Sequence, residues 1–533
     1  MLILTDNTMK KLPLLANLSK KICVFQLFSV IVLDRCVKVC YCSVEEKSSH
    51  HYEQTESDDM TKFNKAELRD KIYACWLGKN IGGTLGTPFE GRREVLDVTG
   101  FNSEPGNPLP NDDLDLQLIW LLAVMERGRD IHERVLGEYW LEYISPYWNE
   151  YGVGKSNMTR GLIPPFSGEY ENEWKHSNGA WIRTEVWACL NPGLVEETIR
   201  YGYMDSCVDH GKGDGTYATI FVAAMESAAF VISDLRALIE IGLSKIPEDC
   251  RFAKFIRTVI EAHDSGKTWL EARNMVTDMA LSFKDLGWFQ APTNVAYAVI
   301  GLLYGDGDFK KTMLTAINCG DDTDCTGATV GSLLGIIGGT KVIPEDWKAY
   351  IGDKIVTVAI NRGAAYGIPL SCTALTDKIM ELHAVMLAGK PVAVTDGETE
   401  IDAADSEKFK GKAFSDLLAA HSDYSFRTES VLAETWVDLE REPVLAPGEE
   451  LGIKLSLNNR FRSQKHFSVR FILPEGWSYR GKRDISVKHM GNIAVGEYVI
   501  KAGDTVDAQN RVIIEITCEG HADTALIPLV ILG

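Results

Sequence analysis

The sequence lacks the basic surplus that is typical of proteins that bind nucleic acid. Its 533 residues include 55 lysines and arginines against 75 aspartates and glutamates, so the formal net charge is −20. No long run of lysine and arginine occurs, although proteins that grip phosphates usually carry one. We therefore expect no nucleic-acid partner. An anionic ligand stays compatible with a site in which helix N-termini or a cation supply positive charge.

The cysteines lack a pattern that predicts zinc binding or a disulfide framework. None of the twelve cysteines belongs to a C-x-x-C pair, which is a common spacing in zinc sites. Single cysteines scattered along a large chain are more typical of a reduced protein than of a secreted one. We therefore expect a cytoplasmic protein without a zinc site of this kind.

The first 59 residues lack a complete targeting signal. The mostly apolar stretch 22–33 follows two lysines, but it is too short to cross a bilayer, and no small-residue cleavage site follows it. We expect no membrane span and interpret residues 1–59 as a poorly ordered N-terminal extension. Secretion is the alternative, if residues 20–42 act as a signal.

The spacing of apolar residues divides the rest of the chain into three parts. In residues 60–388 they recur every three or four positions, which predicts helices. Residues 389–424 are acidic and poor in apolar side chains, which is typical of a linker. Residues 425–533 alternate with period two between turn residues, which predicts about seven short strands. The expected fold class is therefore mainly α, with an all-helical domain followed by a small C-terminal antiparallel β-sandwich.

A first acidic cluster lies within the segment Asn111–Asp115, at the start of a predicted helix. One acidic residue there would suffice to cap the helix and complement its dipole. Three aspartates repel one another, so we expect a compensating partner for Asp112 and Asp113. Taken alone, this cluster supports helix capping and metal ligation equally.

A second acidic cluster, Asp321–Asp324, precedes a helix with Gly327, Gly331 and Gly335 on one stripe. The stripe predicts the close approach of another backbone. Three aspartates in four residues indicate oxygen ligation of Mg²⁺, Mn²⁺ or Ca²⁺ rather than zinc. Two such clusters about 200 residues apart suggest that they meet in space, and four buried carboxylates need cations to neutralise them.

Three further segments carry weaker signals. The glycine-rich stretch 77–91 lacks the ending of a phosphate-binding P-loop, and a residue such as Glu90 is more often part of a surface turn. Segments 177–183 and 209–217 are dense in small and polar residues, so their backbone N–H groups are able to hold an anion. Ordinary loops that begin helices explain both segments as well. The lone His210 does not distinguish an anion-binding loop from an ordinary one.

In this order, the segments resemble the motifs of the ADP-ribosylglycohydrolase family. The resemblance covers roughly residues 70–339. Each match is weak alone, whereas five matches in the right order are specific. The matching motifs are Gly86–Gly91, Asn111–Leu114, Asn178–Arg183, Asp209–His210 and Gly320–Cys325.

The resemblance implies an all-α fold that usually holds two Mg²⁺ ions, with Mn²⁺ as the alternative. It implies cleavage of the glycosidic bond that joins ADP-ribose to an acceptor such as arginine, serine or another ADP-ribose. Metal ligands would be Asp112, Asp113, Asp322 and Asp324, and Glu90 would lie beside the metals.

The resemblance also implies a substrate region and a base. The residues that would border ADP-ribose are Asn178, Gly179, Asp209 and His210. Glycosidic cleavage passes through an oxocarbenium-like state, and metals are able to anchor ribose hydroxyls and orient water. We expect Glu90 or Asp113 to act as the base on that water.

The sequence departs from the family pattern at several positions. Lys79–Asn80 stand where the family often has aspartate, and Asn111 and Leu114 replace hydroxyl residues. Cys325 replaces a threonine, and a thiol is a poor Mg²⁺ ligand. The number of bound metal ions, one or two, therefore stays open. Two other functions stay open as well: hydrolysis of another nucleoside or ribosylated small molecule, and binding of ADP-ribose without catalysis. The four retained aspartates favour an enzyme.

Overall fold

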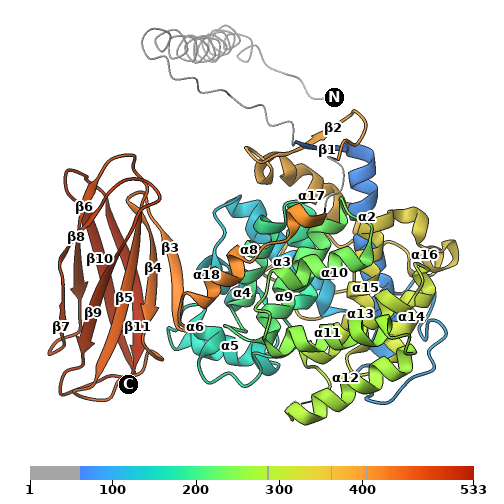
Figure 1. Cartoon of the computed structure of the whole chain (residues 1–533), viewed down its shortest axis with the longest axis horizontal. Coiled ribbons are helices and arrows are strands. Elements are labelled where there is room, and N and C mark those ends of the chain that lie inside the picture. Colours follow the sequence, from blue (N-terminus) through green and yellow to red (C-terminus); the bar gives the residue numbers. More distant parts are fainter. Residues whose placement is uncertain (1–59, 285–286, 362, 402–405) are drawn as a thin grey trace, which may run out of the picture. The chain divides into compact units, whose positions relative to one another are not determined.

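The computed structural model describes residues 60–284, 287–361, 363–401 and 406–533 (Figure 1). The predicted N-terminal extension, residues 1–59, lies outside the described residues. Helices dominate as far as Met386, and antiparallel strands follow from Ser425 onward. The structure confirms the predicted fold class, which is mainly α with a β-rich C-terminal region.

The helices of the first region are mostly short to medium in length. Within the described residues, none of them is long and apolar enough to cross a membrane. Their bounds are α2 Lys65–Gly86, α3 Asp112–Arg127, α4 Glu133–Tyr143, α5 Asn149–Thr159, α6 Phe166–Glu169, α7 Glu185–Leu190, α8 Val195–Ser206, α9 Asp214–Ala229, α10 Leu235–Ser244, α11 Arg251–Asp264, α12 Trp269–Phe283, α13 Ala291–Tyr304, α14 Phe309–Asn318, α15 Thr323–Gly338, α16 Glu345–Ile351 and α17 Cys372–Met386; short 3₁₀ turns are η2 Thr87–Phe89, η3 Trp181–Arg183 and η4 Thr340–Val342.

Helices α2 and α15 pack backbone against backbone at the centre of this region. A Cβ atom on Gly78 would lie 2.1 Å from the carbonyl oxygen of Gly331, and one on Gly82 would lie 2.0 Å from that of Gly327. Any larger side chain at these positions would force the helices apart. The glycine stripe therefore does what the sequence predicted, and it fixes the first turn of α15 against α2.

The segment predicted as a linker also contributes a strand to the fold. It holds η5 Ser406–Phe409 and the single helix α18 Ala413–Ala419. Strand β2 (Val392–Thr395) also pairs in parallel with β1 (Thr61–Asn64), which immediately precedes α2. These strands are only four residues long, and pairing between segments so distant in sequence leaves no local signal.

The C-terminal strands form two antiparallel sheets. One has the order β11-β10-β6-β8 and the other the order β3-β4-β5-β9-β7. In β5, Leu451 and Ile453 are buried, whereas Glu450 and Lys454 are exposed, as the period of two predicts. The bounds are β3 Ser425–Glu429, β4 Ala433–Leu439, β5 Glu450–Asn459, β6 Lys465–Ile472, β7 Ser478–Gly481, β8 Asp484–Val487, β9 Ile493–Lys501, β10 Gln509–Cys518 and β11 Thr524–Leu532.

Candidate metal centre

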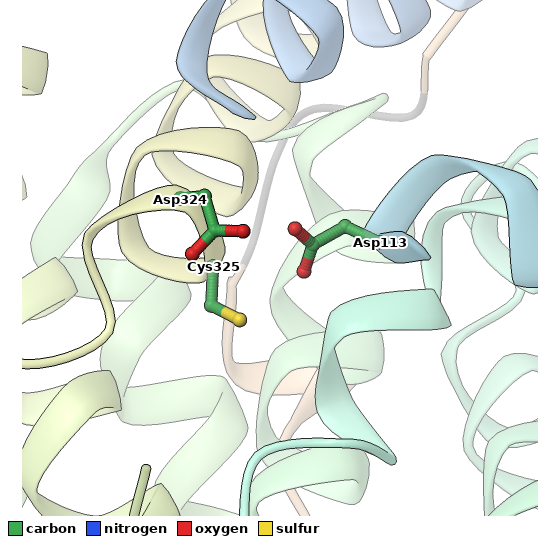
Figure 2. A group of neighbouring side chains, drawn as sticks. All are labelled: Asp113, Asp324 and Cys325. Atoms are coloured by element: carbon green, nitrogen blue, oxygen red, sulfur yellow. The ribbon is translucent and has the colours of Figure 1, made fainter. Parts of the chain in front are cut away.

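The structure brings the two acidic clusters together at the N-terminal ends of α3 and α15. Potential ligand atoms of Asp113, Asp324 and Cys325 all lie within 4.8 Å of one another, and those of Glu90, Asp322 and Asp324 do the same. Figure 2 shows the carboxylates of Asp113 and Asp324 facing each other from their two helices, with the Cys325 sulfur beside the gap. The two groups share Asp324, so they form one continuous centre.

Backbone hydrogen bonds join the turn that carries Glu90 to the second cluster. The N–H of Gly91 donates to the carbonyl of Asp321 at 2.9 Å, and the N–H of Asp321 donates to the carbonyl of Arg92 at 2.8 Å. Asp321 has a φ of 60°, a left-handed conformation that aspartate adopts more readily than most residues. This short bridge holds the carboxyl of Glu90 next to the start of α15.

Helix capping in the first cluster is performed by Asn111. Its side chain accepts a hydrogen bond from the N–H of Asp113 at 2.7 Å. Asp115 has a different task, because its Oδ2 accepts a hydrogen bond from the N–H of Ala359 at 2.8 Å. Asp113 is fully buried, and neither of its oxygens has a hydrogen-bond partner among the described residues. Capping therefore does not explain Asp113, which remains available to a ligand.

Asp112 lies at the edge of the centre. Its Oδ2 accepts a hydrogen bond from the hydroxyl of Tyr151 at 3.3 Å, and the residue is half-buried. Among the described residues, Asp112 belongs to neither group of converging ligand atoms. Tyr151 carries no sequence signal that would have identified it.

Burial and mutual repulsion raise the pKa values of these acids. Burial and then the charge of Asp324 raise the pKa of Asp113 and of Asp322 well above the usual range, and that of Asp112 to about 6. Partial desolvation, followed by Asp324 and Asp112, raises the pKa of Glu90 to about 8. Oδ1 of Asp322 and Oδ1 of Asp324 also lack hydrogen-bond partners within the described chain. Unsatisfied hard oxygen donors with uncompensated charge fit a divalent cation.

These pKa shifts predict an unusual pH dependence of stability without metal. A carboxyl whose folded pKa exceeds its unfolded value of about 4 keeps its proton in the folded state. Between the two values the folded state binds more protons, so the free energy of unfolding falls as pH rises. With Asp112 near 6 and Glu90 near 8, the fall should extend from about pH 4.5 to about pH 8.

Urea denaturation across this pH range, in chelator and in excess Mg²⁺, measures the effect. Bound cations keep the carboxylates ionised in the folded state, so Mg²⁺ should flatten the pH profile and raise stability most at the alkaline end. A chelated protein whose stability rises over the same range would contradict this electrostatic account.

A second layer of buried charge lies behind the centre. Nζ of Lys79 and Oε1 of Glu185 form an ion pair of 2.6 Å, and both side chains are fully buried. Gln117 donates through Nε2 to Oε2 of Glu185 and to the carbonyl of Asp113, each at 2.8 Å. The charge of Lys79 partly offsets the raised pKa of Asp113. The lysine that departs from the family pattern therefore joins a supporting network.

The sequence analysis did not predict Glu185 and Gln117 as site residues, because isolated polar residues within helical sequence give no functional signal.

The loop predicted to border the substrate is tied directly to the centre. Nδ2 of Asn178 donates to Oδ2 of Asp322 at 2.6 Å, and its Oδ1 accepts from the indole N–H of Trp181 at 2.9 Å. A Cβ atom on Gly179 would lie 2.3 Å from Oε1 of Glu150, so the close fit requires glycine. The structure thus places Asn178 in contact with the acidic centre, and Gly179 follows it against Glu150.

Asp209 and His210 lie behind this loop and are fully buried. Arg183 donates to Oδ1 of Asp209 at 2.7 Å and to Oδ1 of Asp205 at 2.8 Å, and all three side chains are fully buried. Nε2 of His210 lies 3.1 Å from Oγ of Ser177. The network of Arg183, Asp205, Asp209 and His210 therefore supports the segment 177–183 from the protein interior. The predicted motif Asn178–Arg183 includes Arg183, the central residue of this network. The sequence predicted neither the pairing of Arg183 with Asp205 nor the burial of these side chains.

The part of the chain that carries the acidic centre matches the model of a known family. A family model described as ADP-ribosylglycohydrolase matches residues 64–377, which is more than half of the 533 residues. Among curated proteins, none matches the chain significantly.

Solved structures with some similarity cover different shares of the chain. An "ADP-ribosylglycohydrolase-related protein complex" is 21% identical, with a TM-score of 0.39, over 61% of this chain and 99% of that chain. A FixG-related protein from Vibrio parahaemolyticus is 13% identical, with a TM-score of 0.17, over 21% of this chain and 97% of its own. The GAE domain of GGA2p from Saccharomyces cerevisiae is 14% identical, with a TM-score of 0.15, over 20% and 97%.

Proposed function

Because the chain belongs to the ADP-ribosylglycohydrolase family, we propose that it hydrolyses the bond between ADP-ribose, or a related ribosyl group, and an acceptor, using Mg²⁺ or Mn²⁺. Family membership supports a hydrolase of glycosidic bonds. The observation that carries the metal dependence is the meeting of Asp113, Asp322 and Asp324. Both oxygens of Asp113, Oδ1 of Asp322 and Oδ1 of Asp324 are buried without a hydrogen-bond partner among the described residues. When bound, divalent cations would anchor ribose hydroxyls and make a water molecule more acidic.

Glu90 is better placed than Asp113 to act as the base. Glu90 is exposed at the rim of the centre, whereas Asp113 is fully buried. A base has to come within hydrogen-bond reach of the attacking water, so it needs an approach from solvent or substrate. We therefore assign proton acceptance to the carboxylate of Glu90 and ligation to Asp113, with Asp322 and Asp324 as further ligands. Asp112 would join them at the edge through its second oxygen.

The substrate is expected to enter beside Asn178 and Gly179. The amide of Asn178 is held by Asp322 and Trp181, so its orientation is fixed before a ligand arrives. Asp209 and His210, which are fully buried, would act on the substrate through Arg183 and the loop rather than by direct contact.

Exchange of Glu90 for glutamine separates catalysis from binding. Glu90→Gln should reduce turnover of an ADP-ribosylated substrate by about 10²-fold to 10⁴-fold, which is the usual contribution of a positioned base. Measured at saturating metal, ADP-ribose binding should be retained, because Asp113, Asp322 and Asp324 would still hold the cations.

Glu94→Gln is the matched control, since Glu94 follows on the same turn and pairs at the surface with Arg92 at 2.7 Å. It should turn over substrate at the wild-type rate. Wild-type turnover in Glu90→Gln would overturn the assignment of Glu90 as the base, and wild-type turnover in Asp113→Asn as well would exclude both carboxylates from that role.

A further inference from the structure

The two groups of ligand atoms differ in their chemistry. Glu90, Asp322 and Asp324 offer oxygen alone, and Glu90 is exposed. Asp113, Asp324 and Cys325 offer two carboxylates and a thiol, and all three residues are buried. Divalent ions differ strongly in their affinity for such donor sets, because Mg²⁺ prefers oxygen ligands whereas softer ions accept sulfur. We call these groups the oxygen subsite and the sulfur subsite.

The backbone that carries Cys325 is packed tightly against α2. Cys325 lies in the first turn of α15, where a Cβ atom on Gly86 of α2 would lie only 2.4 Å from the backbone nitrogen of Asp324. Two turns so closely apposed fix the position of the backbone from which the Cys325 side chain extends. Figure 2 shows the sulfur next to the gap between the carboxylates of Asp113 and Asp324.

Oxygens without a hydrogen-bond partner point independently to a ligand in the sulfur subsite. Both oxygens of Asp113 and Oδ1 of Asp324 are buried and have no hydrogen-bond partner among the described residues. Asp113 is fully buried and Asp324 is 6% exposed. Lys79, the nearby buried cation, already pairs with Glu185 at 2.6 Å. A bound cation would satisfy oxygens that the protein leaves without partners.

We propose that Asp113, Asp324 and Cys325 form a subsite that selects a thiophilic divalent ion such as Zn²⁺ or Co²⁺ over Mg²⁺. The oxygen subsite keeps its preference for a hard ion. Coordination forms a sulfur–metal bond, and the thiol proton leaves to solvent, so no oxidant or reductant takes part. The inference rests on the metal centre of the proposed function, but it does not depend on the identity of the substrate.

Cobalt titration of the metal-free full-length chain tests this subsite directly, because a thiolate bound to Co²⁺ gives a near-ultraviolet charge-transfer band. The titration uses a background in which four further cysteines, which could bind Co²⁺ themselves, are changed to serine: Cys23, Cys36, Cys40 and Cys42. The band should appear in this background and saturate at one equivalent. It should disappear in Cys325→Ser, and it should persist in Cys207→Ser, which removes a buried thiol that belongs to neither subsite.

Competition between ions gives a second measurement. Cys325→Thr should lower the preference for Zn²⁺ over Mg²⁺ by on the order of 100-fold, at the upper end of what changes at metal sites cost. Bound Co²⁺ without a charge-transfer band in the background protein would overturn the proposal, and this result needs no folded variant at position 325. A band that survives Cys325→Ser would do the same. A band without any turnover of ADP-ribosylated substrates would keep the sulfur subsite and reject the proposed function.

Discussion

Replacement of Asp324 by asparagine should lower turnover of an ADP-ribosylated substrate by about 10³-fold, which corresponds to about 4 kcal/mol in activation free energy. Asp324 is the one residue shared by both groups of ligand atoms, so its loss weakens every cation position at once. The substitution nearly preserves size and shape, so the effect reports lost charge rather than lost packing.

The same variant should be more stable than the wild type when metal is absent. The charge of Asp324 raises the pKa of Asp113, Asp322 and Glu90 after the contribution of burial, which shows that these acids repel one another. Removal of one buried charge relieves that repulsion. Chemical denaturation in chelator should therefore give a higher unfolding free energy for Asp324→Asn, and added Mg²⁺ should stabilise it less than the wild type.

Asp321→Asn provides the matched control for Asp324→Asn. Asp321 lies in the same segment but in neither ligand group, and its φ of 60° suits asparagine. Its turnover should stay at the wild-type level. If Asp324→Asn kept wild-type turnover, or if it destabilised the metal-free protein, Asp324 would be a structural residue.

Replacement of Arg183 by methionine should destabilise the protein by about 3–5 kcal/mol or more, which is typical when one partner of a buried ion pair is removed. Arg183 neutralises both Asp205 and Asp209, and all three side chains are fully buried. Although burial opposes it, Arg183 followed by His210 lowers the pKa of Asp209 to about 2. Methionine would leave two carboxylates without their cation.

Urea denaturation of Arg183→Met measures this loss, and Arg69→Met is its control. Arg69 pairs with Asp377 at 2.7 Å, but their side chains are 40% and 53% exposed, so its removal should cost about 0–1 kcal/mol. Arg183→Lys should also be destabilised, because an ammonium lacks the planar fork that reaches both aspartates. Equal losses in Arg183→Met and Arg69→Met would contradict the role given to the buried network.

The fold class was readable from the sequence because the change in apolar spacing coincides with a change in structure. Apolar residues in helices such as α2 recur every three or four positions, whereas buried side chains alternate with more exposed ones in the first half of β5. The glycines of α15 also predicted the close approach of another backbone, which is that of α2. Such features are local, so a single sequence carries them. Pairing of β1 with β2 joins segments more than 300 residues apart, and nothing local encodes it.

The aspartates of the centre were predictable as a set, but their individual tasks were not. Asn111 caps α3 and Asp115 anchors a loop, so only the structure separates them from Asp113. Composition cannot distinguish these tasks, because all of these residues belong to one short polar segment. Burial likewise separates Asp209 and His210 from the exposed Glu90.

The most direct test of the central claim is the release of free ADP-ribose from an ADP-ribosylated substrate by the wild-type protein, with and without chelator. The account predicts release in Mg²⁺ or Mn²⁺, loss of release on chelation, and recovery when the cation is restored. Release that is unaffected by chelation would contradict the metal centre. Absence of release from folded, metal-loaded protein, across acceptors that include arginine, serine and ADP-ribose, would contradict the proposed reaction.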